Sequence, residues 1–260
     1  MRILVTFAVD AEFAQWRSRH PFVPYEFDES GQRRNFDLFR GNIGANEVTV
    51  LLTGMGGENA KRAIGTIPLQ LHDFCLCTGL AGALDSNLKL GEIVVGQRAE
   101  SADNTQKTES DPELVRIAIA LGARAVNVFV TSDSIVATEE EKELLSSSGG
   151  VVEMETSHIL SAARQFRLPA VAIRAISDVA NEDLPVDFER IADSRGHVKV
   201  GALLKELALH PHRLPLLVRF GRQSRAAAGE LADFLDRYIP AVEKQWRGLN
   251  WTKVEEVSAT

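Results

Sequence analysis

Short apolar segments alternate with helix-like segments from the first residues to about residue 181. Residues 3–7 and 74–78 are among these segments, and they are as apolar as strands that are buried on both faces of a sheet. Parallel strands need crossover connections, which helices usually supply. The alternation therefore predicts an α/β fold with a single domain, in which helices flank a central mixed β-sheet.

The pattern changes after residue 181. Two apolar helical segments, at residues 198–209 and 214–220, predict a C-terminal helical hairpin. Residues 224–238 predict a last amphipathic helix that ends at Pro240, because proline has no amide N–H to donate. We expect one domain built from residues 1–181 and 224–240, with a helical insertion at 182–223 and a tail at 241–260.

Composition excludes several classes of protein. The chain has 260 residues, of which 45% are hydrophobic and 25% are charged, and this balance is typical of a folded protein rather than a disordered one. The two cysteines cannot form a disulfide framework, and no signal peptide or membrane-spanning run is visible, so we expect a cytoplasmic protein. The net charge of −7 argues against a general nucleic-acid binder.

Charge is unevenly distributed along the chain. Residues 195–225 contain seven Lys or Arg and only one acid, Glu206, so the rest of the chain is more acidic than the total suggests. A solvated helical pair explains this basic segment, since long basic side chains often cover a helix while their stems pack. The functional alternatives are a lid, a subunit interface, or a weak contact with an anionic membrane surface.

Three separated motifs carry the functional signal. They read TGMGGENA at residues 53–60, CTGLAGALD at 77–85 followed by LGEIVV at 90–95, and VEMET at 152–156 with RAISDV at 174–179. Together they resemble the nucleoside phosphorylase/nucleosidase superfamily, and most closely its methylthioadenosine/S-adenosylhomocysteine nucleosidase branch. The resemblance covers roughly residues 2–180 and the last helix, and it implies a homodimer that acts on a nucleoside.

Asp178 is the first candidate catalytic residue. It follows a buried strand, and open α/β sheets bind ligands at the carboxyl ends of their strands. Breaking a glycosidic bond requires an acid for the leaving group and a group that stabilises the cationic ribosyl transition state. The resemblance implies that Asp178 protonates or hydrogen-bonds N7 of a purine, and that Ser177 orients it.

The resemblance assigns the other candidates to the sugar. Glu155 would bind the ribose hydroxyls and stabilise the oxocarbenium charge, Met154 would pack against the sugar, and Glu12 would activate the attacking water. Each carboxylate also has a purely structural reading. Glu155 opens a helix and could simply be its cap. Asp10 lies only two residues from Glu12, and only one of these two acids need be catalytic.

The remaining candidates bind substrate. Ile135 and Val136 stand where the family stacks and brackets the base, and Ile135 replaces the aromatic ring usual there. Gly54 and Gly79 are substrate-binding candidates from the two glycine motifs, and the resemblance places the turn at Gly54 at the sugar end of the pocket. Cys75 and Cys77 fall on one face of a strand and are expected to pack as hydrophobes, so no metal is expected.

The expected activity is hydrolysis of a purine nucleoside without metal or organic cofactor. Phosphorolysis is the alternative, but the arginine and serine of the phosphorylase branch are missing around residues 75–80, where Leu80 stands, and Glu12 would repel phosphate. Arg33, Arg34 and Arg40 could still supply a phosphate site. A nucleoside-binding or membrane-associated protein without turnover is the alternative of another class.

A nicotinamide-dependent enzyme is a third reading. Gly54 and Gly56 partly match a dinucleotide-binding turn, but Asn59 replaces its third glycine, and this makes the match weak.

Overall fold

The structure is a computed structural model that describes residues 1–25, 36–185 and 214–258, with side chains described up to residue 246. Its ten strands form one mixed sheet, and five of them close into a barrel because β5 pairs with both β9 and β10. The barrel runs in the order β10 (Ala170–Asp178), β6 (Ile93–Ser101), β8 (Arg124–Thr131), β9 (Val151–Glu153), β5 (Phe74–Ala83).

The other strands extend the sheet from the barrel. Their order beyond β5 is β1 (Arg2–Phe7), β4 (Asn46–Leu52), β3 (Leu38–Ile43), β2 (Val23–Pro24), and β7 (Lys107–Glu109) pairs with β6. Leu76 of β5 pairs in parallel with Val5 of β1 on one side and with Val171 of β10 on the other. The predicted mixed sheet is confirmed, but closure into a barrel was not expected.

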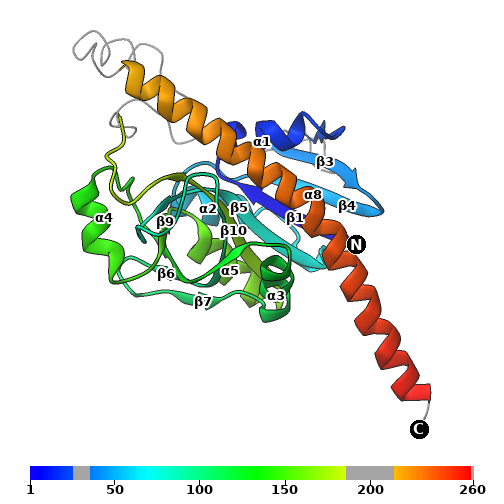
Figure 1. Cartoon of the computed structure of the whole chain (residues 1–260). Coiled ribbons are helices and arrows are strands. Elements are labelled where there is room, and N and C mark those ends of the chain that lie inside the picture. The colour runs from blue at the N-terminus through cyan, green and yellow to red at the C-terminus, as the bar shows by residue number, and fades with distance from the viewer. Residues whose placement is uncertain (26–35, 186–213, 259–260) are drawn as a thin grey trace.

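Helices cover both faces of the sheet (Figure 1). One apolar cluster joins the sheet to α1 (Asp10–Arg17), α3 (Pro112–Ala120) and α8 (Leu214–Ser258), and the other joins it to α2 (Gly57–Ile64) and α5 (Thr156–Gln165). Successive strand residues alternate between the clusters, as the two-residue period of a strand requires. Cys75 and Cys77 therefore share the second cluster, where both are buried free thiols.

The long helix α8 corrects two predictions. Residues 214–220 and 224–238 belong to one continuous helix, which crosses the molecule and passes through Pro240 (Figure 1). The predicted stop at Pro240 is wrong. Tyr238, Ile239 and Val242 are fully buried, and this packing outweighs the hydrogen bond that the proline removes.

The basic segment is described only in part. Residues 198–209, the first arm of the predicted hairpin, lie outside the described residues. Where α8 begins, Leu214, Leu216 and Val218 are exposed. In the described ranges, no helix combines the length and apolarity that a bilayer crossing requires.

One further boundary differs from prediction. The strand expected at residues 74–78 continues to Ala83, because β9 and β10 pair with its second half. After α2 ends at Ile64, a separate 3₁₀ turn, Leu69–Leu71, follows. Around the site, α4 (Glu139–Ser146) follows its N-cap, Thr138, whose side chain accepts from the Glu141 amide.

Candidate active site

The candidate side chains from the three motifs converge with Glu12, Ile135 and Val136 on one pocket of about 200 Å³. It lies where α1 begins, where β5 and β10 end, and where β9 leads into α5. The predicted residues that line it are Glu12, Ile135, Val136, Met154, Glu155, Ser177 and Asp178. These residues are spread over most of the chain, and the carboxyl-end geometry of the sheet brings them together.

Gly54 and Gly79 are not among the lining residues. Gly79 has φ +143°, and a Cβ there would come within 2.5 Å of Arg174 Nη1 and 2.8 Å of the Glu12 carboxylate. Gly54 has φ +78°, and its amide donates to the Ala8 carbonyl at 2.9 Å, so it joins the ends of β4 and β1. Both glycines therefore shape the backbone around the charged residues of the pocket.

Glu12 lies in the first turn of α1, and backbone amides from outside the helix hold its carboxyl group. Its Oε1 accepts from the Leu80 amide at 2.8 Å, and its Oε2 accepts from the Ala8 amide at 3.0 Å. Burial raises the pKa of Glu12, although the positive charge of Arg174 and these amides act in the opposite direction. Glu12 is thus a rigidly oriented carboxyl group whose proton affinity is higher than that of an exposed glutamate.

Glu155 faces the same end of the pocket. Its Oε1 accepts from the Gly56 amide at 2.8 Å, and its Oε2 lies 3.7 Å from Arg174 Nη2. Burial, together with the negative charge of Glu153, raises the pKa of Glu155 to about 8. A carboxyl group with this pKa exchanges its proton near neutral pH.

The helix-cap reading of Glu155 does not describe its side chain. Glu155 occupies the N-cap position of α5, but its carboxylate makes no cap hydrogen bond. Glu153 performs this role instead, and its Oε2 accepts from the amides of Glu155 at 2.9 Å and Thr156 at 2.8 Å. Because Glu153 caps the helix, the side chain of Glu155 can face the pocket.

Arg174 is a site residue that the sequence analysis missed. Its guanidinium is 1% exposed, and Nη2 donates to Glu153 Oε2 at 2.7 Å. Its Nη1 donates to the Thr78 carbonyl at 3.1 Å. The sequence feature that could have identified it is an arginine in the middle of the apolar run of β10. A charged side chain at such a position must have a buried partner. Arg174 compensates the three glutamates at this end of the pocket.

Asp178 and Ser177 form the opposite end. The Ser177 hydroxyl donates to Asp178 Oδ1 at 2.8 Å and lies 3.2 Å from the Ala81 carbonyl. Asp178 Oδ2 lies 2.7 Å from Lys142 Nζ of α4, a residue that the sequence analysis did not select. A Cβ at Gly82 would come within 2.9 Å of the same oxygen, so the carboxylate packs directly against the backbone of β5.

Apolar residues complete the walls. Ile135 and Val136 follow β8, and Leu184 approaches from the segment after β10. These two segments are joined, because the Leu184 amide donates to the Ala137 carbonyl at 2.7 Å. Within the described ranges, no group of three or more His, Cys, Asp or Glu side chains is placed to hold a metal ion.

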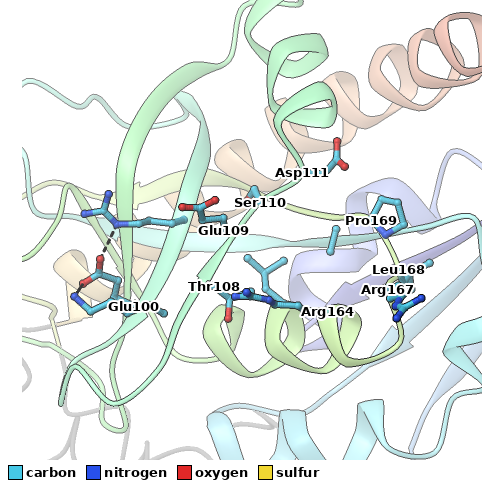
Figure 2. Close-up of a pocket in the computed structure, with 13 residues that line it drawn as sticks. Glu100, Thr108, Glu109, Ser110, Asp111, Arg164, Arg167, Leu168 and Pro169 are labelled. Atoms are coloured by element: carbon cyan, nitrogen blue, oxygen red, sulfur yellow. Dashed lines mark hydrogen bonds and ion pairs between the residues drawn. The ribbon is translucent and has the colours of Figure 1, made fainter. Parts of the chain in front are cut away.

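A larger groove of about 930 Å³ lies elsewhere, between β7 and α5 (Figure 2). Arg98 and Lys107 both pair with Glu100 there, at 2.6 and 3.0 Å. None of the predicted site residues lines this groove. The smaller pocket, and not this groove, gathers the buried carboxyl groups of Glu12, Glu155 and Asp178.

Comparison with known proteins agrees with the three motifs. A family model described as the phosphorylase superfamily matches residues 2–207. A 5'-methylthioadenosine/S-adenosylhomocysteine nucleosidase from Staphylococcus carnosus (strain TM300) is 29% identical over 178 residues, which cover 58% of this chain and 77% of the relative.

Solved structures show the same fold. A nucleosidase of the same type from Colwellia psychrerythraea 34H, solved in complex with adenine, has a TM-score of 0.68 at 20% identity and covers 93% of this chain and 95% of its own. Futalosine hydrolase of Helicobacter pylori has a TM-score of 0.66 at 18% identity, covering 91% of this chain and 98% of its own. Because the family model spans most of the sequence, this chain belongs to the phosphorylase superfamily.

Proposed function

We propose that the protein hydrolyses the N-glycosidic bond of a purine nucleoside of the methylthioadenosine/S-adenosylhomocysteine type. The observation that carries this proposal is the arrangement of carboxyl groups in one small pocket. Asp178 and its serine lie at one end, and Glu12 and Glu155 lie at the other. Glycosidic hydrolysis needs an acid for the leaving group and carboxyl groups near the sugar.

The base would lie against Asp178. As the glycosidic bond breaks, its electrons move onto the purine, and a proton delivered to N7 lets the base depart as a neutral molecule. Ser177 holds Oδ1 of Asp178, so the carboxyl group has a defined direction. Such acid catalysis typically accelerates a reaction about 10²–10⁴-fold.

The ribose would lie over the glutamates. Glu155 can exchange hydrogen bonds with the ribose hydroxyls, and its pKa of about 8 allows it to act with or without its proton. Glu12, whose pKa is also raised by burial, can accept the proton of an attacking water. The ionised form of either glutamate can stabilise a developing oxocarbenium ion, and Met154 can pack against the sugar.

Water is favoured over phosphate as the nucleophile. Phosphate is usually bound by an arginine fork, and Arg174 is already committed to Glu153 and to the Thr78 carbonyl. Glu12 and Glu155 would also repel an anion in their ionised forms. Of the arginines considered for a phosphate site, Arg40 stacks on the Tyr25 ring at 4.0 Å, and residues 33 and 34 lie outside the described ranges.

The substrate class rests on the relatives. The curated relative is a methylthioadenosine/S-adenosylhomocysteine nucleosidase, and futalosine hydrolase has a similar fold. The first name describes a nucleosidase and the second a hydrolase of futalosine, so the two relatives differ in substrate. We propose a cytoplasmic homodimer, in keeping with the resemblance, and keep phosphorolysis and ligand binding without turnover as alternatives.

A panel of nucleosides tests the proposal. Methylthioadenosine, S-adenosylhomocysteine, futalosine, adenosine and inosine are each incubated with the full chain, with and without phosphate, and free base and sugar products are measured. Hydrolysis predicts base release without phosphate and a free ribose derivative as product. Release that requires phosphate and gives a sugar 1-phosphate would identify a phosphorylase, and tight binding without release would identify a binding protein.

A further inference from the structure

Helix α4 buries its lysine and exposes a leucine. Lys142 is 1% exposed, whereas Leu144 is 75% exposed and the acidic residues of the same helix face solvent. An amphipathic helix normally does the opposite. A specific interaction must therefore hold the Lys142 side chain inside the protein, since lysine is almost never fully buried without a partner.

The interaction partners use the whole ammonium group. Nζ lies 2.7 Å from Asp178 Oδ2 and donates to the carbonyls of Val179 at 2.8 Å and Glu182 at 2.9 Å. An ammonium group has three donors, so all of them are engaged. A buried ion pair is often no more stabilising than a well-packed apolar pair, so stability alone gives no reason for a lysine here.

The location of the pair supplies a chemical reason. Asp178 is the proposed acid for the leaving base, and an acid must carry a proton before it can donate one. Ser177 donates to Oδ1, and Lys142 donates to Oδ2. Of these two groups, the Lys142 ammonium is the one that can release a proton, because a serine hydroxyl is far too weak an acid.

We propose that Lys142 is the positioning residue of Asp178 and supplies the proton that Asp178 passes to the leaving base. The inference rests on the proposed nucleosidase function. An N–H bond of Lys142 breaks as an O–H bond forms on Asp178, and that O–H bond breaks as an N–H bond forms at N7 of the purine. The glycosidic electron pair stays with the base. Lys142 is left neutral and regains the proton released when water adds to the sugar.

Lys142 also fixes one wall of the pocket. The carbonyls that it holds belong to the segment that carries Leu184 to the pocket, and the Glu139 amide of the same helix donates to Asp183 at 2.8 Å. The same helix therefore holds both this wall of the pocket and the ammonium group beside Asp178.

The other charged groups around this unit are few. Glu182 pairs with Arg219 of α8, and Asp183 interacts with the start of α4. Glu12 and Glu155 face the pair across the pocket. The remaining acids of α4 are exposed. Because Arg219 pairs with Glu182 and makes no contact with Asp178, its substitution is a control that removes a contact of the segment after β10 and leaves the Lys142–Asp178 pair in place.

The test compares Lys142→Met with the control Arg219→Met in the full chain. Base release is measured from pH 5 to pH 9, with separate kcat and KM values. We expect Lys142→Met to lose about 10²-fold in kcat at neutral pH, at the lower end of what acid catalysis supplies. The deficit should shrink as the pH falls, since protons from solvent then load Asp178. Arg219→Met should keep the wild-type profile.

A deficit that is equal at all pH values, or a change in KM alone, would show a merely structural role and overturn the inference. Lys142→Arg keeps the charge but cannot release a proton, so it should remain slow while folded, and wild-type kcat in this variant would also overturn the inference. Lys142→Arg replaces Lys142→Met if the latter fails to fold. Absence of base release by the wild-type chain would instead refute the proposed function.

Discussion

Each end of the pocket pairs a buried cation with carboxyl groups, but the cations come from different kinds of element. At the sugar end, Arg174 lies within a barrel strand and compensates buried glutamates. At the base end, Lys142 reaches Asp178 from a peripheral helix. Figure 1 shows α4 at the edge of the molecule, whereas β10 runs through its centre.

The difference is one of rigidity. Every residue of β10 is buried, and all except Ser177 pair with β5, so the Arg174 network cannot shift without disturbing the core. The Lys142 contact depends on an eight-residue helix and on the segment after β10. The cation of the sugar end is therefore held by the sheet, whereas the cation of the base end is held by a peripheral helix and a connecting segment.

The largest expected effect concerns Asp178. Asp178→Asn keeps the shape and the Ser177 contact but removes the acid, and we expect kcat to fall about 10²–10⁴-fold while the protein folds normally. Asp183→Asn, which changes the same chemical group outside the pocket, is the matched control. Steady-state base release measures both variants. Near-wild-type turnover of Asp178→Asn would contradict the assignment of the base end.

Arg174 and Lys142 should contribute differently to the free energy of unfolding. Arg174→Met leaves Glu153 unpaired where its side chain is 1% exposed, and breaking such a pair costs about 3–5 kcal/mol of unfolding free energy. Lys142→Met should cost less, because the Asp178 side chain is 12% exposed and can be hydrated. Urea unfolding at pH 7 measures both losses. Equal losses would show that the base end is as rigidly built as the sugar end.

The sugar end should also make stability depend on pH. The folded-state pKa of Glu155 is about 8, above its ordinary value of 4.5, so the folded protein holds a proton that the unfolded chain releases. The unfolding free energy should therefore fall as pH rises through this window, and Glu155→Gln should flatten the dependence. Thermal unfolding at several pH values measures the slope. Glu140→Gln, an exposed change on α4, should leave the slope unaltered, and an unaltered slope in Glu155→Gln would contradict the prediction.

The smallest expected effect concerns the base wall. Ile135→Phe places a ring where the resembled family stacks the base, and an aromatic pair contributes about 0.5–1.5 kcal/mol beyond its buried area. We expect KM for the best nucleoside to fall about 2–10-fold with little change in kcat. Leu144→Phe on the exposed face of α4 is the control. A higher KM would mean that the ring overfills the pocket.

Much of the site could be predicted from local sequence. The three motifs identified Glu155, Asp178 and Ser177, because strand ends carry ligand-binding residues in α/β sheets and the motif spacing resembles one superfamily. The apolar strands were found because buried strands have continuous apolar sequences. The opposite orientation of Glu153 and Glu155 could not be predicted, since either glutamate could cap the helix.

The sequence by itself determined the longer strands and most of the candidate residues that line the pocket, because these follow from apolar runs and motif spacing. Tertiary structure decided the barrel closure, the passage of α8 through Pro240, and the burial of Arg174 and Lys142. Each of these depends on a partner distant in the chain. A charged side chain becomes buried only when such a partner offsets its lost hydration, and no local pattern specifies that partner.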